Sequence, residues 1–294
     1  MTPKPERALA TGPANPGSVT IIEPLTRRPA VDLGECWHFR DLLYFLTWRD
    51  VKVRYKQTLL GVAWAILVPL TQMAIFGVIF GKVAKLPSDG LDPFLFYLAA
   101  LVPWQYFAGA LGQSSASLVN SAHLLTKIYF PRLFIPLAVS LAGLVDFAIA
   151  FAMLLVGMLW LGIIPAPSLV LIPVLLLLTL ATSLGAGLML SALNVKYRDV
   201  KFIVPFLIQI WMYASVLLPF SKLPESWGAW RYLYGLNPMA GIIESFRWCL
   251  LHHEMSAVTP PWALLAMGLP TTAGLLVFGF LYFQRTERLF ADSV

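Results

Sequence analysis

Long apolar runs separated by short charged segments dominate the chain from residue 57 onward. A helix that crosses a hydrocarbon core of about 30 Å needs roughly 20 apolar residues, so each uncharged run of that length is a candidate membrane span. Six runs meet this requirement, and the third contains one acid, Asp146. The pattern predicts an all-α integral membrane protein with six transmembrane helices, at about 58–81, 93–119, 133–162, 168–193, 202–220 and 262–283.

Residues 39–56 have a helical pattern but too many charges to cross a membrane. At about 100° per residue, two apolar stripes lie on opposite sides of this helix: Phe39, Leu42, Leu43, Leu46 and Val53 on one, and Tyr44, Trp48, Val51 and Tyr55 on the other. Such a helix suits the cytoplasmic membrane surface, where one stripe meets lipid and the other meets protein. Anchoring by positive charge alone explains the basic flank but not the second stripe. We therefore expect a cytoplasmic amphipathic interface helix within 31–56, and a disordered tail at 1–30, which contains six prolines.

The segment between the fifth and sixth runs, 221–261, is rich in aromatic residues and sparsely charged. Its apolar stretch at 239–251 is too short to span, and Asn237-Pro238 is a signal for a helix start. We expect a re-entrant pair of short helices at 224–251 that dips into the outer leaflet; an aromatic belt at the headgroups also explains the tryptophans. Glu244 and Arg247 lie three residues apart on one helical face, where pairing would lower the cost of their burial.

The composition, 59% hydrophobic and 12% charged with a mean hydropathy of +0.75, excludes a water-soluble fold. The net charge is +6, and its distribution predicts an orientation because Lys and Arg accumulate in cytoplasmic loops. Sixteen of the 21 basic residues lie in 1–56, 121–132, 194–201 and 284–294, on one side of the predicted spans, and five lie on the other. We expect a multi-pass protein of the prokaryotic inner membrane with both termini in the cytoplasm, no cleavable signal peptide and no nucleic-acid partner.

The sequence lacks the motifs of the common enzyme classes. No GxxxxGK[ST] loop occurs, which excludes ATP binding by a Walker motif. HExxH, GxSxG and clustered Cys/His sets are also missing, and Cys36 and Cys249 form neither a disulfide framework nor a metal pair. We expect no catalytic residue, no metal and no cofactor in this chain.

Polar and aromatic side chains inside the runs are the candidate substrate contacts. Asp146 is a functional candidate because ionisable groups inside a membrane are costly, and a carboxyl satisfied by neighbouring hydroxyls or backbone is the simpler interpretation. Glutamines in spans can hydrogen-bond across helices or to a polar substrate, and aromatic faces stack on sugar rings. The candidate translocation path comprises Trp64, Gln72, Phe76, Phe206, Gln209, Trp211 and Tyr213. Gly77 and Gly81 form a GxxxG face suited to close packing of another helix.

Five segments together resemble a known family. WRDVKVRYKQT, LGVAWAILVPL, LLTKIYFPRLFIPLA, ALNVKYRDVKFIVPF and LNPMAGIIESFR occur in this order and on the predicted sides. From about residue 33 to the C-terminus the chain resembles the membrane subunit of ABC-2 type polysaccharide exporters, the permeases for O-antigen, capsule and teichoic acid chains.

The resemblance implies a homodimer that assembles with two copies of a separate ABC ATPase subunit, which binds ATP and Mg. It also implies a lipid-linked polysaccharide substrate and contact with membrane lipids. The ATPase would dock on 123–132, at His123, Lys127, Tyr129, Phe130, Pro131 and Arg132. The cytoplasmic entrance or its support would comprise Arg49, Lys52, Arg54, Asn194, Tyr197, Arg198 and Asp199. The path would run between spans one and five of the two copies, with an outer gate formed by Asn237, Pro238, Glu244 and Arg247.

These features predict a permease subunit that moves an O-antigen-like polysaccharide out of the cytoplasm in ATP-driven steps. The alternatives are an ABC-2 permease for a capsule or teichoic acid polymer, or one for a small lipid or drug. A proton-coupled secondary transporter requires paired intramembrane charges and repeated halves, which this sequence lacks. A membrane glycosyltransferase requires grouped acids, whereas Glu225, Glu244 and Glu254 are dispersed.

Overall fold

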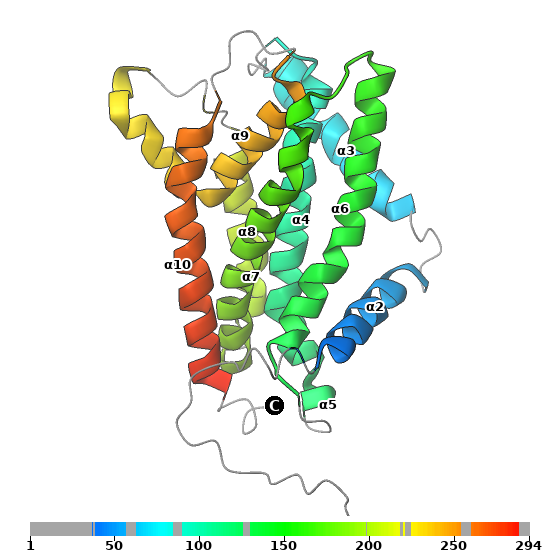
Figure 1. Ribbon diagram of the computed structural model, residues 1–294, viewed down its shortest axis with the longest axis vertical. Helices are drawn as coiled ribbons and strands as arrows, with labels where there is room; N and C mark the ends of the chain where they lie inside the picture. The colour runs from blue at the N-terminus through cyan, green and yellow to red at the C-terminus, as the bar shows by residue number, and fades with distance from the viewer. Residues whose placement is uncertain are drawn as a thin grey trace, which may run out of the picture. The chain divides into compact units, whose positions relative to one another are not determined.

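The computed structural model describes residues 37, 39–56, 63–84, 90–125, 130–197, 199–217, 220, 225–253 and 260–287. All of them belong to one compact unit, 32–294 (Figure 1). These ranges form helices joined by turns and contain no strand, as the apolar runs predicted. The tail expected at 1–30 lies outside the described residues.

Five helices of membrane length confirm five of the six predicted spans. They are α3 (Ala63–Phe76) continued by the π-helix η1 (Gly77–Val83), α4 (Pro93–Asn120), α6 (Phe134–Trp160), the 3-10 helix η2 (Pro167–Leu171) continued by α7 (Ile172–Lys196), and α10 (Trp262–Glu287). The fifth run forms α8 (Val200–Val216), whose 17 residues extend roughly 25 Å, a little less than a hydrocarbon core of about 30 Å. The plan of six spans therefore stays a prediction.

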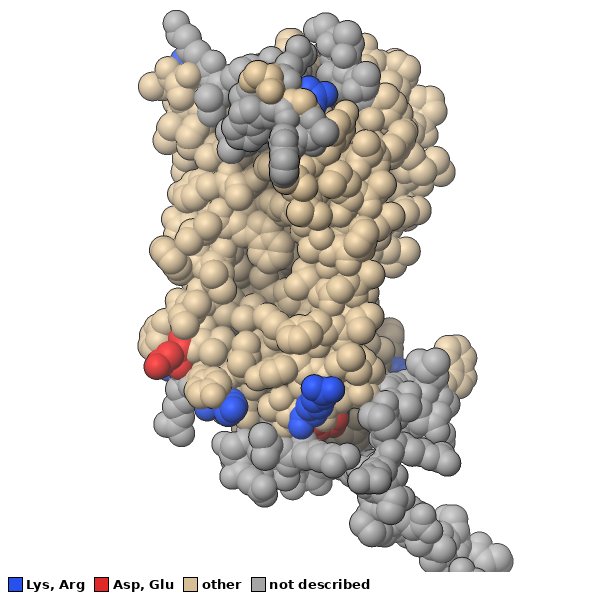
Figure 2. Space-filling view, turned by 90° about the vertical axis from the view of Figure 1, so that its left-hand side faces the viewer, with Lys and Arg blue, Asp and Glu red and all other residues tan. Residues whose placement is uncertain are grey.

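Charged side chains gather toward the two ends of the face shown in Figure 2, and uncharged side chains cover its middle. A bilayer favours this distribution because charge placed in hydrocarbon is costly. Together with the five long apolar helices, it describes a multi-pass membrane protein.

Helix α4 lies at the centre of the packing and contacts α3, α6, α7, α8 and α9 (Figure 1). Asp92 fixes its start, because the carboxylate accepts a hydrogen bond from the backbone N–H of Phe94 at 2.9 Å and Pro93 needs no partner at the first helical position. Phe107 and Leu118 are fully buried farther along the helix. The bundle is thus built around α4.

Close packing of η1 on the start of α4 confirms the predicted GxxxG face. A Cβ atom built on Gly77 would lie 2.5 Å from the Phe94 ring, and one built on Gly81 would overlap Pro93. A second close approach joins α7 to α10, where a Cβ on Gly279 would overlap the carbonyl oxygen of Gly185. Small residues allow such backbone contact between membrane helices.

Helix α2 (Arg40–Lys56) confirms the helix predicted at 39–56 and packs on α6. Leu46 is buried, whereas Tyr44 and Trp48 on the opposite side are exposed. The first stripe therefore packs on protein at Leu46, whereas Tyr44 and Trp48 of the second stripe are left available to lipid. Tyr55 of the second stripe departs from this pattern, because its hydroxyl bonds to Asp146 of α6. A location of α2 at the membrane surface stays a prediction. Val53 lies on the same side of the helix as Leu46 but is 56% exposed, whereas the neighbouring Arg54 reaches Asp146 of α6.

A broken pair of short helices follows α8. The 3-10 segment η4 (Glu225–Leu236) has a kink at Gly228, where φ is 53°, and α9 (Pro238–Leu251) begins after Asn237. Asn237 lies beside Trp211, more than a turn before the end of α8, whereas the other end of α9 reaches the α6–α7 connection, where the Ser168 hydroxyl donates to the Cys249 carbonyl at 2.8 Å. The pair thus enters the bundle and returns to the end that holds the α6–α7 connection (Figure 1). Its insertion into the outer leaflet stays a prediction.

Candidate functional site

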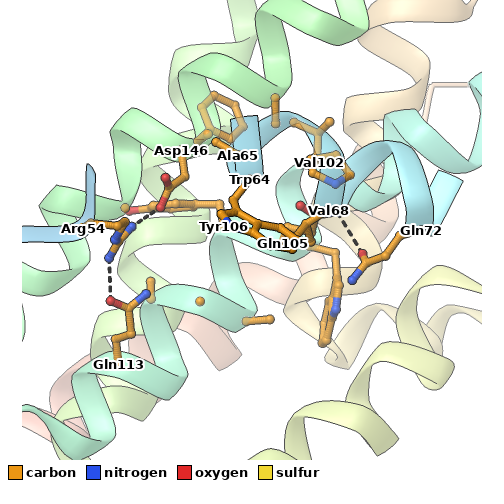
Figure 3. Close-up of a pocket in the computed structure, with 18 of the residues that line it drawn as sticks. Arg54, Trp64, Ala65, Val68, Gln72, Val102, Gln105, Tyr106, Gln113 and Asp146 are labelled. Atoms are coloured by element: carbon orange, nitrogen blue, oxygen red, sulfur yellow. Dashed lines mark hydrogen bonds and ion pairs between the residues drawn. The ribbon is translucent and has the colours of Figure 1, made fainter. Parts of the chain in front are cut away.

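A cavity of about 480 Å³ opens between α2, α3, α4 and α6 (Figure 3). Its wall is mainly apolar, and its volume falls in the range of about 300–1,000 Å³ that is typical of small-molecule sites. The polar residues among those that line it are Arg54, Tyr55, Gln72, Gln105, Tyr106, Gln113 and Asp146. An apolar cavity with a few convergent polar groups is the candidate functional site of this chain.

Asp146 is held by two side chains from α2. Its carboxylate pairs with the guanidinium of Arg54 and accepts a hydrogen bond from the hydroxyl of Tyr55. Arg54 also donates to the side-chain oxygen of Gln113, so this one residue joins α2 to both α4 and α6 (Figure 3). The sequence suggested that hydroxyls or backbone groups satisfy the Asp146 carboxyl. The Tyr55 hydroxyl does so, together with the Arg54 guanidinium, which the sequence did not indicate. Arg54 and Asp146 are 92 positions apart, so no local spacing could reveal the pair.

Partial burial shifts the titration of both α2 residues. It lowers the pKa of Arg54, against the opposing effects of Tyr55 and Asp50. It raises the pKa of Tyr55, against the opposing effect of Arg54. The raised pKa favours the protonated form of the Tyr55 hydroxyl. The hydroxyl therefore remains a donor to the carboxylate.

The ion pair lies near one end of the membrane-length part of α4 rather than at its centre. Gln113 follows Pro93 by twenty residues, or roughly 30 Å of helix, which is about the thickness of a hydrocarbon core. Trp64, in the first turn of α3, lines the same cavity. A hydrocarbon core that began at Pro93 would therefore end near Gln113 and the Arg54–Asp146 pair.

Two of the predicted path residues, Trp64 and Gln72, line this cavity. The side-chain nitrogen of Gln105 donates to the side-chain oxygen of Gln72 at 2.8 Å, and Trp64 is 52% exposed (Figure 3). Phe76, three turns along α3, is instead buried in the core and packs beside Tyr97 with 5.9 Å between ring centroids. This packing indicates that Phe76 has a structural role within one chain.

The predicted path residues of α8 point in two directions. Phe206 and Tyr213 are exposed, and the amide of Gln209 donates to the hydroxyl of Tyr213 at 3.3 Å. Trp211 points inward, where its ring packs on Phe107 with 4.8 Å between centroids. None of these α8 residues lines the cavity. That the exposed residues Phe206 and Tyr213 line a path between two copies stays a prediction.

Asn237 and Pro238 form the junction between η4 and α9. The side-chain oxygen of Asn237 caps α9 by accepting from the backbone N–H of Met239 at 3.2 Å, and it accepts a second hydrogen bond from the indole of Trp211 at 2.7 Å. Its side-chain nitrogen donates to the hydroxyl of Ser215 at 2.8 Å. The junction is therefore fastened to α8 by both ends of one amide.

Glu244 and Arg247 form the ion pair that their spacing predicted. Their side chains are 10% and 0% exposed, and the guanidinium meets the carboxylate at 2.9 Å. Arg247 also donates to the carbonyl of Val216 at 3.0 Å and lies over the ring of Phe96 at 3.9 Å, while its Nε has no hydrogen-bond partner among the residues that the structure describes. The pair thus holds α9 against the end of α8 and against α4.

Comparison with protein families shows the family of this chain. The ABC-2 type transporter family matches residues 41–251, from α2 to the end of α9 and well over half of the chain. The chain belongs to this family. The O-antigen export system permease protein RfbA of Myxococcus xanthus is 30% identical over 261 residues, which cover 88% of this chain and 98% of the relative. A protein of the same name from Klebsiella pneumoniae is 30% identical over 251 residues, covering 85% and 95% of the two chains.

In this ABC-2 chain the segment predicted to dock an ATPase is partly described. Phe130 is buried in a cluster with Phe134 of α6, and Arg132 donates to the backbone oxygen of Glu287 at the end of α10 at 2.5 Å. His123 is exposed on the short helix α5 (Ala122–Leu125), and Pro131 is half-buried. Lys127 and Tyr129 lie outside the described residues.

The predicted entrance residues do not converge on one place. Asn194 is buried and donates from its amide to the carbonyl of Ser115 at 3.0 Å, so it joins α7 to α4. The members at exposed or half-buried positions outside the cavity are Arg49, Lys52, Tyr197 and Asp199. Arg198 lies outside the described residues. Arg54 alone among the described members lines the cavity.

Proposed function

We propose that this chain is the membrane-spanning permease subunit of an ATP-driven exporter that moves a lipid-linked polysaccharide of the O-antigen kind out of the cytoplasm, across the inner membrane. The observation that supports this most strongly is its likeness to O-antigen export permeases, which extends over 98% of the Myxococcus relative. One fold can carry many functions, so sequence similarity to these permeases over the whole length is stronger support than the family match. The aromatic and amide side chains of the cavity also suit a hydroxyl-rich substrate.

A separate subunit hydrolyses ATP in this proposal, because the sequence has no Walker loop. Two copies of the chain assemble with two ATPase subunits, which bind ATP and Mg and dock on 123–132. The contacts of Phe130 with α6 and of Arg132 with α10 support this segment as a drive point. A push on it would be transmitted to two membrane-length helices at once.

The proposal includes six spans, with α8 as the fifth and both termini in the cytoplasm. The excess of basic residues on that side supports the orientation. The path lies between two copies, because a cavity of about 480 Å³ is too small to enclose a polymer. Exposed apolar side chains on α3 and α8, such as Ile75 and Phe206, supply surface for the second copy. The η4–α9 pair, held by Asn237 and by Glu244 with Arg247, forms the outer gate.

Two measurements test the proposal. In the source organism, removal of the gene should leave the surface without polysaccharide and cause lipid-linked polymer to accumulate inside, and return of the gene should reverse both effects. A surface that keeps its polymer, or a changed small-lipid or drug export instead, would refute the substrate assignment.

The second measurement is copurification of the tagged chain with its ATPase. Phe130→Ala is a poor probe because Phe130 is buried and its loss destabilises the fold. His123→Glu changes an exposed position of α5, and His253→Glu makes the same change at an exposed position near the end of α9. We expect His123→Glu to weaken ATPase recovery and His253→Glu to leave it unchanged. Equal recovery from the two variants would contradict docking on α5.

A further inference from the structure

We infer that the cavity between α2, α3, α4 and α6 binds one sugar residue of the substrate, close to its lipid anchor. This inference rests on the proposed function and adds a recognition site inside each subunit, separate from a path between two copies. Among the described residues, those that line the cavity belong to α2, α3, α4 and α6, and none belongs to α8. Four helices of one chain thus form the site.

The position of the cavity matches the position of a sugar joined to a membrane lipid. Gln113 lies roughly 30 Å along α4 from Pro93, so the cavity begins at headgroup depth and extends toward Gln72 and Gln105. A lipid-linked sugar is held at that depth by its own anchor. A single sugar at this level can enter the cavity without entry of the whole polymer.

The charge balance of the cavity favours a neutral ligand over a phosphate. Arg54 and Asp146 are the charged residues among those that line it, and they are paired with each other. A phosphate that approached Arg54 would meet the Asp146 carboxylate at the same place, and like charges at such distance repel. The described residues of the lining have a net charge of zero, and no other cation among them offsets this repulsion.

The uncharged part of the lining has the two features that a sugar ring requires. Amides both donate and accept hydrogen bonds, as hydroxyl groups do, and the pairing of Gln105 with Gln72 leaves the nitrogen of Gln72 and the oxygen of Gln105 for a ligand. Aromatic surface covers the apolar face of a ring: Trp64 is half-exposed, and the buried rings of Trp104 and Tyr106 on α4 also line the cavity. Amides and aromatic rings therefore converge on one small space.

Saturation-transfer difference NMR on the purified homodimer in phosphatidylcholine nanodiscs tests the site. The probes are the methyl glycosides of glucose, galactose, mannose and N-acetylglucosamine, with inorganic phosphate as competitor. Gly109→Leu should narrow the cavity, and its Cβ is accommodated because it meets the Gln113 side-chain nitrogen at an ordinary contact distance of 3.8 Å. Gly274→Leu is the matched control, since a Cβ on this α10 glycine meets nothing within 4 Å and the residue is not in the lining.

We expect at least one glycoside to give a signal in the wild type and in Gly274→Leu, to lose it in Gly109→Leu, and to keep it in excess phosphate. A signal that survives in Gly109→Leu would place the sugar elsewhere and overturn the inference. The same holds if no glycoside gives a signal, or if phosphate abolishes the signal, because the site would then prefer an anion.

A second pair of variants tests whether the lining itself binds the sugar, in case Gly109→Leu acts by changing the shape of the cavity. Trp64→Ala should weaken glycoside binding by about threefold to tenfold, the worth of one aromatic contact. Trp160→Ala, at a 91% exposed position outside the lining, should not. Equal effects of the two would overturn the inference. These binding results do not depend on transport, so failure of the gene-deletion test would refute the proposed function and leave them standing.

Discussion

The ion pair between Glu244 and Arg247 makes a quantitative prediction about stability. Glu244→Leu removes the carboxylate and leaves the guanidinium of Arg247, whose side chain is fully buried, without its charge partner. Removing one member of a buried pair costs about 3–5 kcal/mol. For a chain of this size, that loss corresponds to a fall in Tm of about 6–20 °C.

Removal of both charges should be far less damaging. Replacing a buried pair by apolar residues of similar volume gains up to about 1–4 kcal/mol. Loss of the hydrogen bond to the Val216 carbonyl offsets this by about 1–3 kcal/mol. We therefore expect the double variant Glu244→Leu with Arg247→Met to unfold near the wild-type temperature, so that the double-mutant cycle gives a large coupling energy.

Cys249 provides the assay, because it is a buried free thiol on α9, two residues beyond Arg247. In a Cys36→Ser background, a thiol-reactive fluorogenic dye reports the temperature at which Cys249 becomes accessible. Asp41→Leu is the control: its side chain is 92% exposed beside Arg40, and such a pair contributes about 0–1 kcal/mol. If Glu244→Leu shifts the transition no more than Asp41→Leu does, or if the double variant is as unstable as the single one, the reasoning is refuted.

Three further predictions concern helix contacts. Gly279→Ala should destabilise the protein by about 1–3 kcal/mol in the same thermal assay, because its methyl group meets backbone of α7, whereas Gly274→Ala, which meets open space, should be neutral or slightly stabilising. Asn237→Ala should cost about 1–2 kcal/mol and accelerate hydrogen exchange at the start of α9, since it removes the cap; exchange that changes equally in α4 would contradict a local effect. Asp146→Asn should weaken the attachment of α2 by about 1 kcal/mol only, because its ion pair with Arg54 is partly exposed. The measurement is the rate of proteolysis in α2, which should rise. An unchanged rate would show that the pair does not hold α2.

Length and periodicity were sufficient to predict most of the helices. The uncharged runs marked five membrane-length helices, and the i, i+3 spacing predicted the contact of Glu244 with Arg247 because both lie on one helix. The Asn-Pro signal likewise marked the start of α9. In each case the determining interaction is local, so a short window of sequence contains it.

Contacts between distant segments were not predictable in the same way. Asp146 stood out as a single acid in a span, but its partner Arg54 is set by how α2 crosses α6. Phe76 and Trp211 are aromatic residues of the kind that line a sugar path, yet both pack inside the chain, because composition does not say which way a side chain faces. The cavity itself arises from four helices whose arrangement no single motif encodes.

The unequal attachment of α3 has a mechanical consequence. At η1, Gly77 and Gly81 press against the start of α4 with no room for a side chain, whereas at the opposite end Trp64 is half-exposed beside the cavity. The helix is therefore held most tightly at η1, so a tilt of α3 would pivot about Gly77. Thirteen residues, or roughly 20 Å, separate this pivot from Trp64, so a tilt of about 10° displaces the tryptophan by roughly 3 Å. The wall of the cavity is thus the part of α3 that moves farthest for the smallest rotation.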